Sequence, residues 1–188
     1  MSDYRLLYQG GSVGNIVLPA SKSISNRVLL MRALSQAQQP IYNVADCEDT
    51  TLMAKALVST STTKDVGAAG TAMRFLTAYY ACCPGQWLLT GTERMKQRPI
   101  ALLVEALRSI GAEISYTEKE GYPPLQITGR PLTGGEIDIY AGVSSQYLSA
   151  LLMLAPYMQQ GLVLHWEGAL TSQPYVEMTL QLMKQFGV

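Results

Sequence analysis

The sequence predicts an α/β fold made of three loosely similar units. Runs typical of a strand alternate with longer apolar-rich runs typical of a helix along the whole chain. Gly, Pro and small hydroxyl residues mark the points where the expected helices begin. Of the 188 residues, 48% are hydrophobic and 15% are charged, which is typical of a well-buried globular core. A chain of this length can form one large domain, or a domain and a half.

The first unit is expected to run strand, helix, strand, helix. These four elements fall at residues 14–18, 23–34, 40–44 and 50–58. In the second unit, a Gly-rich turn leads into a helix within residues 67–81, and a strand, a second helix and a hairpin follow. These later elements fall at residues 86–89, 99–110, 112–116 and 125–128, with the hairpin turn at 121–124. Gly111 ends the second helix, as Gly commonly does at a helix C-terminus.

The third unit is expected to have strands at residues 136–140 and 162–166, and helices at 145–156 and 174–186. In this register, small hydroxyl residues or glycines open the first helix of each unit, at residues 21–23, 70–71 and 144–146. A second set precedes the later helices, at residues 49–50, 98–99 and 172–174. Each start could be an ordinary helix cap. Three equivalent starts could also direct their free N–H groups and dipoles into one cleft and bind a polyanion.

Charge and composition exclude some classes of function. The 14 basic and 14 acidic residues cancel, so no long-range field favours nucleic acid or an acidic membrane, and any anion site must be local. The N-terminus lacks a basic flank followed by an apolar run, and apolar stretches such as residues 148–156 are too short to span a bilayer. The three cysteines show no metal-binding spacing, which favours a reduced cytoplasmic protein. His165, the only histidine, lies in a strand-like run and is interpreted as structural.

Cations gather at the first expected helix start. In the run LPASKSISNR, Lys22 and Arg27 lie where a helix N-terminus is already partly positive. Hydroxyl groups surround the same point, at Ser21, Ser23 and Ser25. Ser23 and Arg27 are four residues apart and share a helix face, and Arg27 is expected to be exposed there. Phosphate fits such a place; the alternative is a serine N-cap followed by solvated basic residues.

A second group of cations, Arg94, Lys96 and Arg98, precedes the second helix of the second unit. Glu93 is the only acid nearby, so this group also favours an anion site. Arg74, in the first helix of the same unit, either extends this pattern or pairs with a carboxylate that supports the fold.

Six short motifs occur in this order along the chain: LPASKSISNR, AGTAMR, RMKQRPI, GYPPL, VSSQYLSALL and SQPY. Together they closely resemble the 3-phosphoshikimate 1-carboxyvinyltransferase family, also called EPSP synthases, over residues 11 to 188. The resemblance implies one lobe of a two-lobed enolpyruvyl transferase fold, with three βαβαββ units around a pseudo-threefold axis and helix N-termini facing the interlobe cleft. Residues 1–12 are then expected to pair with the second lobe. Residues 13–188 are expected to form the substrate-binding lobe without its last hairpin, as a fragment.

The resemblance also implies an activity, the transfer of the enolpyruvyl group from phosphoenolpyruvate to the 5-hydroxyl of shikimate 3-phosphate, in aromatic amino-acid biosynthesis. The isolated lobe is expected to bind substrate without turnover. The residues implied to contact shikimate 3-phosphate are Lys22, Ser23, Arg27, Ser144, Ser145, Gln146, Ser172 and Tyr175. Those implied to contact phosphoenolpyruvate are Lys22, Gly70 and Arg98. Lys22 is also the implied catalytic residue, for proton transfer or charge stabilisation.

The implied partners are the two small-molecule substrates and the second lobe, with no metal or other cofactor, no nucleic acid and no membrane. The complete enzyme is expected to be a cytoplasmic monomer. Two alternatives stay open. One is the related transferase of cell-wall synthesis, which acts on a nucleotide sugar and usually offers a reactive loop cysteine, whereas Cys82 and Cys83 look like helix-end residues. The other is a non-catalytic anion-binding module.

The chain departs from the family pattern at three places. Ala68 stands where many members carry asparagine, so a side-chain amide is lost beside the phosphoenolpyruvate site. Phe75 stands where proline is common, and could shift its helix and alter the response to glyphosate, the inhibitor that occupies that site. Residues 59–66 are too few for the hairpin that closes the first unit, so a loop is expected there.

Overall fold

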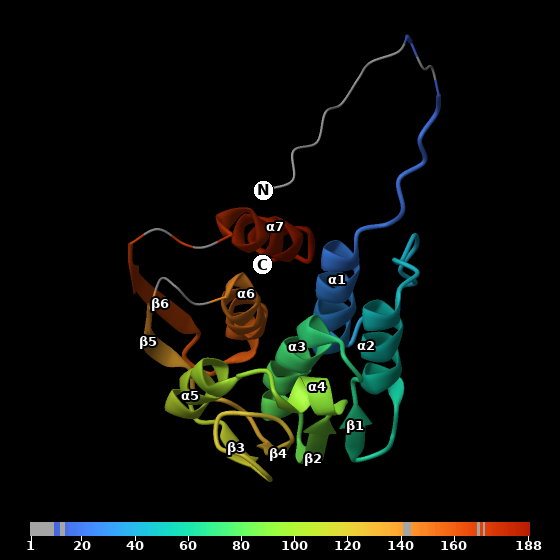
Figure 1. The fold of residues 1–188 in the computed structure, drawn as a ribbon. Coiled ribbons are helices and arrows are strands. Elements are labelled where there is room, and N and C mark those ends of the chain that lie inside the picture. The colour runs from blue at the N-terminus through green and yellow to red at the C-terminus, as the bar shows by residue number, and fades with distance from the viewer. Residues whose placement is uncertain (1–9, 12–13, 141–143, 169, 171) are drawn as a thin grey trace, which may run out of the picture.

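The computed structural model describes residues 10–11, 14–140, 144–168, 170 and 172–188. Within them, helices pack against a four-stranded sheet and a two-stranded sheet (Figure 1). The helices are α1 (Lys22–Leu34), α2 (Glu48–Val58), α3 (Gly70–Cys82), α4 (Glu93–Lys96), α5 (Ala101–Ser109), α6 (Ser145–Leu154), the 3-10 turn η1 (Ala155–Tyr157) and α7 (Gln173–Gln185). The strands are β1 (Thr63–Asp65), β2 (Gly85–Thr90), β3 (Glu113–Tyr116), β4 (Leu125–Gly129), β5 (Gly135–Tyr140) and β6 (Leu162–Glu167). In this part of the chain, no helix is both long and apolar enough to cross a membrane.

The second unit of the sequence is a complete βαβαββ motif. β1, α3, β2, α5, β3 and β4 follow one another, with the short helix α4 before α5. The sheet has the order β1-β2-β4-β3, in which β1 and β2 are parallel and the other neighbours are antiparallel. The predicted helices of this unit, its strand β2 and its β3–β4 hairpin are confirmed.

The first strand of this motif, β1, lies where the sequence predicted a loop. Of its three side chains only that of Lys64 is buried. The Lys64 ammonium lies 5.3 Å from the ring centre of Tyr80 and 5.0 Å from that of Trp87, and it donates a hydrogen bond of 2.7 Å to a backbone carbonyl. The aromatic faces and the carbonyl stabilise the buried charge. The inward-facing residue of β1 is therefore a lysine, whereas a sequence pattern predicts a strand from apolar residues at such positions.

The first unit differs from its prediction. Helices α1 and α2 form as expected, but neither predicted strand, at residues 14–18 or 40–44, is found among the described residues. Apolar side chains in the first run are highly exposed, at 85% for Ile16, 92% for Val17 and 81% for Leu18. An apolar run forms a strand only when another strand satisfies its backbone groups, and none lies beside it in the described part of the chain. In the second run, Asn43 has a φ of 54°, which interrupts an extended backbone.

The third unit repeats the order of the second, as β5, α6, β6 and α7, with β5 and β6 parallel. All four of its predicted elements are confirmed. The N-terminal segment at residues 1–12, which was expected to pair with a second lobe, lies almost wholly outside the described residues. That pairing stays a prediction.

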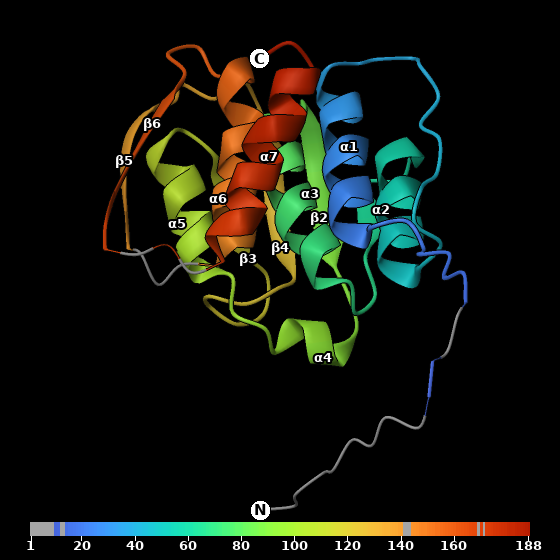
Figure 2. The same cartoon turned by 90° about the horizontal axis from the view of Figure 1, so that it is seen from above.

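α3 forms the centre of the helical layer. Ten of its thirteen residues are buried, and it contacts α1, α2, α5 and α6 as well as β2 and β4. Figure 2 shows α1, α3, α6 and α7 side by side, with their first residues at the same end. We call this end, where α1, α2, α3, α6 and α7 begin at Lys22, Glu48, Gly70, Ser145 and Gln173, the helix-start face.

Candidate anion-binding site

Contacts between helices hold the helix-start face together. Gln146 Nε2 donates to Thr71 Oγ1 at 3.2 Å, which joins α6 to α3. Lys22 Nζ lies 3.1 Å from Asp49 Oδ1, which joins α1 to α2. The surface expected to be shared by the first helices of the three units is thus confirmed (Figure 2). Because the first N–H groups of a helix carry partial positive charge, this face favours anions.

The helices on this face differ in their caps. Ser21 and Ser144 accept hydrogen bonds of 3.4 Å and 3.3 Å from backbone N–H groups of their own helices, as the cap interpretation predicts. Ser172, before α7, has a φ of 59° and makes no cap bond with its side chain. The N-cap of α3 is Ala69, which has no side-chain acceptor. The start of α3 is therefore left without a side-chain cap.

Two arginines meet at the start of α3. The Arg98 guanidinium lies so close to Gly70 that a Cβ at position 70 would lie 2.7 Å from Arg98 Cζ. Arg74, one turn further along α3, is buried and donates a hydrogen bond of 2.9 Å to the Gly70 carbonyl oxygen. Burial lowers the pKa of Arg74, Tyr147 raises it, and the like charge of Arg98 lowers it again. The chain thus holds two positive charges close together.

Tyr147 contacts Arg74 and the residue that follows Arg98. Its ring centre lies 5.5 Å from Arg74 Cζ. Its hydroxyl donates a hydrogen bond of 2.9 Å to the carbonyl oxygen of Pro99, the residue after Arg98. Within the described residues, neither arginine forms an ion pair with a carboxylate, so they give no support to the carboxylate-partner interpretation of Arg74. Like charges held together without a counter-ion favour an anion beside them.

Arg94 and Lys96, which the sequence grouped with Arg98, have different surroundings. They lie in α4, a short helix that the sequence pattern did not predict. Lys96 Nζ lies 2.9 Å from a Glu118 oxygen and 3.1 Å from a Glu93 oxygen, and hydrogen bonds to these carboxylates raise the pKa of Lys96. Arg94 is exposed. The expectation that all three basic residues gather around an anion is wrong for Lys96, because two carboxylates already balance its charge.

Lys22 and Ser23 open α1 as predicted, and half of the Lys22 side chain is exposed. The second carboxylate oxygen of Asp49, its partner, is buried and has no hydrogen-bond partner among the described residues. The side-chain amide of Asn26, one turn after Lys22, is buried and unpartnered in the same sense. Sequence reasoning named Asp49 as a helix start but not as a partner of Lys22, and it missed Asn26. Asn26 could have been found, because it lies four residues after Lys22 and so shares its helix face. The contact with Asp49 could not, because Asp49 lies on a separate helix.

Arg27 is only 2% exposed, so the expectation of an exposed position is wrong. Its Nε donates to Thr179 Oγ1 at 2.7 Å, and its Nη2 donates to Ser149 Oγ at 2.8 Å. Further bonds run to backbone oxygens, from Nη1 to Ser23 at 2.9 Å and from Nη2 to Tyr175 at 3.4 Å. Burial lowers the pKa of Arg27 to about 10, against an opposing effect of Tyr175. The guanidinium therefore stays charged at neutral pH.

Arg27 can be buried because hydroxyl groups from two later helices accept its hydrogen bonds. Ser149 lies one turn after Ser145 on α6, and Thr179 lies one turn after Tyr175 on α7. Both hydroxyls are buried, and they lie 2.9 Å apart. Sequence reasoning missed Ser149 and Thr179, although small hydroxyl residues one turn after an implied ligand, on an otherwise apolar face, were a signal.

The structure brings some of the implied site residues together. Tyr175, which is 44% exposed, contacts Arg27 through its carbonyl and with its ring centre 5.9 Å from the guanidinium. Gly70 meets Arg98, and Gln146 reaches α3. Ser144 and Ser172 are exposed at the starts of α6 and α7, and Ser145 is buried there.

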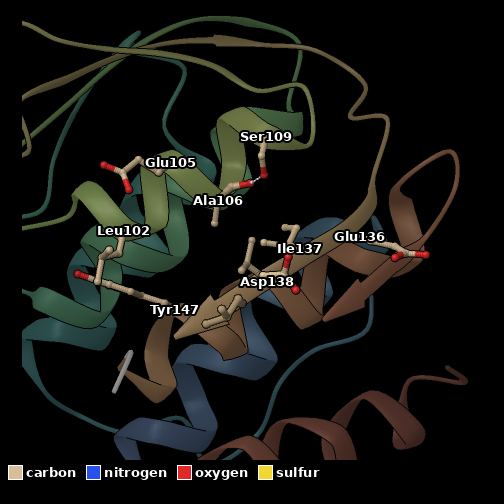
Figure 3. A pocket seen from close by; sticks show the side chains of 10 residues that line it. Leu102, Glu105, Ala106, Ser109, Glu136, Ile137, Asp138 and Tyr147 are labelled. Carbon is tan, nitrogen blue, oxygen red and sulfur yellow. Dashed lines mark hydrogen bonds between the residues drawn. The ribbon is translucent and has the colours of Figure 1, made fainter. Parts of the chain in front are cut away.

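A groove of about 380 Å³ lies between α5, α6 and β5, with Tyr147 in its lining (Figure 3). Its described lining includes the carboxylates of Glu105, Glu136 and Asp138 and no lysine or arginine, so it would repel an anion. His165 lies nearby on β6, exposed, with Nε2 3.3 Å from Glu136 Oε2. Nowhere in the described residues do three or more His, Cys, Asp or Glu side chains gather in a way that could hold a metal ion.

Comparisons with known proteins match this chain to one family. The sequence profile of EPSP synthase (3-phosphoshikimate 1-carboxyvinyltransferase) matches residues 9–64 and 57–188. The 3-phosphoshikimate 1-carboxyvinyltransferase of Bacteroides fragilis is 56% identical over 172 residues, which cover 92% of this chain and 42% of that protein. The protein of the same name from Photobacterium profundum is 43% identical over 201 residues, which cover 93% of this chain and 47% of that protein.

A solved structure shares the fold. EPSP synthase from Acinetobacter baumannii superimposes with a TM-score of 0.74 at 21% identity, over 87% of this chain and 42% of that one. The expected α/β lobe of the enolpyruvyl transferase fold is thereby confirmed. The chain spans less than half the length of the relatives it matches, at 42% and 47% of the two proteins above.

Proposed function

This chain belongs to the EPSP synthase family, and on that premise we propose that it forms the shikimate 3-phosphate-binding lobe of an enolpyruvyl transferase. The complete enzyme would transfer the enolpyruvyl group from phosphoenolpyruvate to the 5-hydroxyl of shikimate 3-phosphate, giving EPSP and phosphate. One observation carries the proposal. Helices from all three units begin on one face, and there Arg27, Arg74 and Arg98 have no carboxylate in ion-pair contact among the described residues.

Phosphoenolpyruvate binds, in this proposal, at the start of α3. The exposed Arg98 guanidinium lies against Gly70 and beside the buried Arg74. A small ligand with a phosphate and a carboxylate would relieve the repulsion between the two guanidinium groups. The uncapped N–H groups of α3 add donors that suit either acidic group.

Shikimate 3-phosphate binds, in this proposal, across the starts of α1, α6 and α7. Its phosphate and ring hydroxyls need donors and acceptors of several kinds, and this part of the face offers them. The contacts that we assign to it come from Lys22, Ser23, Arg27, Ser144, Ser145, Gln146, Ser172 and Tyr175. Arg27 supplies a charge close to the half-buried Ser23 and the exposed Tyr175, and it donates hydrogen bonds to the backbone carbonyls of both.

The proposed chemistry is addition followed by elimination. The 5-hydroxyl attacks C2 of phosphoenolpyruvate as C3 gains a proton, and phosphate then leaves. The tetrahedral intermediate carries two phosphates and a carboxylate, so cations fixed beforehand around it lower the barrier. Lys22 would act here by proton transfer or by charge stabilisation, with its ammonium held by Asp49 on the helix-start face.

The partner in this reaction is the second lobe of the same enzyme, which would close the cleft over the helix-start face. We further propose that the complete protein works as a monomer in the cytoplasm and binds neither nucleic acid nor membrane. Because the closing lobe excludes water and adds charged groups, the 188-residue chain alone should bind shikimate 3-phosphate weakly and should not turn it over.

The thiols weigh against the transferase that acts on a nucleotide sugar. Cys82 is the last residue of α3 and Cys83 is its C-cap, as the sequence predicted. Burial raises the pKa of Cys82 to about 11, helped by Cys83, so a reactive thiolate is disfavoured at neutral pH. The assays below distinguish the proposed lobe from a non-catalytic anion-binding module.

Two assays on the 188-residue chain test the proposal. Calorimetric titration with shikimate 3-phosphate should give weak, saturable binding, and titration with shikimate, which lacks the phosphate, should give none. A phosphate-release assay with both substrates should stay at background, because each missing donor to the intermediate is commonly worth about 2.7–4 kcal/mol. Release at roughly 1–1000 per second would contradict the proposed need for a second lobe. Inorganic phosphate that binds as tightly as shikimate 3-phosphate would favour the non-catalytic module.

A further inference from the structure

Two aromatic rings enclose the guanidinium group of Arg27. Its Cζ lies 5.4 Å from the ring centre of Phe75 and 5.9 Å from that of Tyr175. Phe75 is fully buried within α3, whereas Tyr175 lies in the first turn of α7 and is 44% exposed. One ring is therefore fixed inside the protein, and the other lies at the surface of the helix-start face.

Arg27 needs this enclosure because its charge is buried without a carboxylate partner among the described residues. Its hydrogen bonds use four of its five N–H groups, and every acceptor is a neutral hydroxyl or carbonyl oxygen. Neutral acceptors satisfy the hydrogen bonds of the guanidinium group but do not neutralise its charge, which stays buried away from water. The face of an aromatic ring is negative and attracts a cation most strongly where water is excluded.

We propose that Phe75 is a positioning residue for substrate binding. Its ring holds the Arg27 guanidinium charged and in one orientation, and an acidic group of shikimate 3-phosphate then becomes the counter-ion that the described residues do not supply. This inference rests on the proposed function, because it requires Arg27 to meet that substrate. Phe75 acts through Arg27, since it is fully buried and belongs to the core.

A double-mutant cycle tests whether Phe75 acts through Arg27. The variants are Phe75→Leu, which keeps an apolar side chain but lacks the ring, Arg27→Gln, and the double variant. Calorimetric titration with shikimate 3-phosphate is run well below every melting temperature. We expect affinity to fall roughly three- to tenfold for Phe75→Leu, the scale of a cation–π contact, and further for Arg27→Gln. In the Arg27→Gln background, Phe75→Leu should change affinity no further.

Fluorination separates the charge of the ring from its packing. The sequence contains only two phenylalanines, Phe75 and Phe186, so a Phe186→Leu chain grown with fluorinated phenylalanine carries the label at position 75 alone. Fluorine weakens the negative face of the ring while changing its shape little. Affinity for shikimate 3-phosphate should fall stepwise with one, two and three fluorines. The matched control is the Phe75→Leu chain labelled at Phe186, at the C-terminal end of α7, where fluorination should leave affinity unchanged.

The outcomes separate this inference from the proposed function. If the unaltered chain does not bind shikimate 3-phosphate, both fail. If it binds and Arg27→Gln weakens binding, but the Phe75 series changes only the melting temperature, Phe75 has a packing role and the inference alone is overturned. Equal losses from Phe75→Leu in both backgrounds would also overturn it, because Phe75 would then act independently of Arg27.

Discussion

The starts of α1 and α3 both carry arginines, but the protein holds them in different ways. At α1, Arg27 is buried with four acceptors from three helices, and Lys22 is balanced by Asp49. At α3, the exposed Arg98 lies beside Arg74 with no carboxylate in contact among the described residues. Arg27 at α1 is tied into the framework as well as assigned to a substrate, whereas Arg98 at α3 is assigned to a substrate alone. A substitution at α1 should therefore affect folding and binding, and one at α3 should affect binding alone.

The largest expected effect is on stability, for Arg27→Ala. Removing the guanidinium leaves the buried Thr179 hydroxyl without its donor, takes one of two donors from Ser149, and leaves a space in the core between α1, α6 and α7. We expect the free energy of unfolding to fall by about 3 kcal/mol, the cost of leaving such groups unsatisfied. Urea unfolding measures this change. Arg94→Ala, which removes an exposed arginine, is the control and should change stability by less than about 0.5 kcal/mol. Equal stability of the two variants would remove the contrast between the two helix starts.

Arg98→Ala should instead reduce binding without changing stability. In the complete two-lobed enzyme we expect the KM for phosphoenolpyruvate to rise by about one to two orders of magnitude, the scale of a lost charged hydrogen bond of about 1.5–3 kcal/mol. The matched control is Lys96→Ala, because Lys96 is already held by Glu93 and Glu118. A rise confined to the KM for shikimate 3-phosphate would show that the two substrates have been assigned to the wrong helix starts.

The fold was predictable wherever an apolar pattern decides an element. The helices and the strands β2 to β6 follow such patterns, apart from the short helix α4. β1 does not, because its inward residue is Lys64, whose burial depends on two aromatic rings from other elements. The runs at residues 14–18 and 40–44 have strand-like composition, but a strand also requires a neighbouring strand, which composition does not report.

The site was predictable in its helix starts but not in its burial. Caps, glycines and cations are local signals, and they located the helix-start face. The acceptors of Arg27 lie 122 and 152 residues away, at Ser149 and Thr179, and meet it only when α6 and α7 pack against α1. The same holds for Lys96, whose carboxylate Glu118 is 22 residues away.

A smaller effect is expected for Gly70→Ala. The new Cβ would collide with the Arg98 guanidinium, which is the end of a flexible side chain and can move aside. Affinity for phosphoenolpyruvate should fall by about five- to tenfold, equivalent to about 1–1.4 kcal/mol. Stability should not fall, because alanine is a better helix former than glycine. Loss of stability with unchanged affinity would indicate that Gly70 serves the fold and not the site.

The smallest expected effect concerns pH. Burial lowers the pKa of Arg27 to about 10 in the folded chain, well below its ordinary value, so the buried charge destabilises the folded state wherever the group is charged in both states. This loss of stability is fully present below about pH 10 and is relieved as the pH rises above that value. Relative to Arg27→Gln, the unaltered chain should gain less than about 1 kcal/mol between about pH 9 and about pH 10.5. A stability difference that falls over this range would contradict the charged, buried state of Arg27.

The most direct test of the central claim is to map the binding of shikimate 3-phosphate onto the backbone by two-dimensional NMR. We predict that the N–H signals that move during the titration belong to the first turns of α1, α6 and α7, including Ser23, Ser145 and Tyr175. Signals from α4 and from the residues of α5 and β5 that line the groove should stay in place. Shifts that gather in that groove or around Lys96, or no shifts at all, would contradict the account.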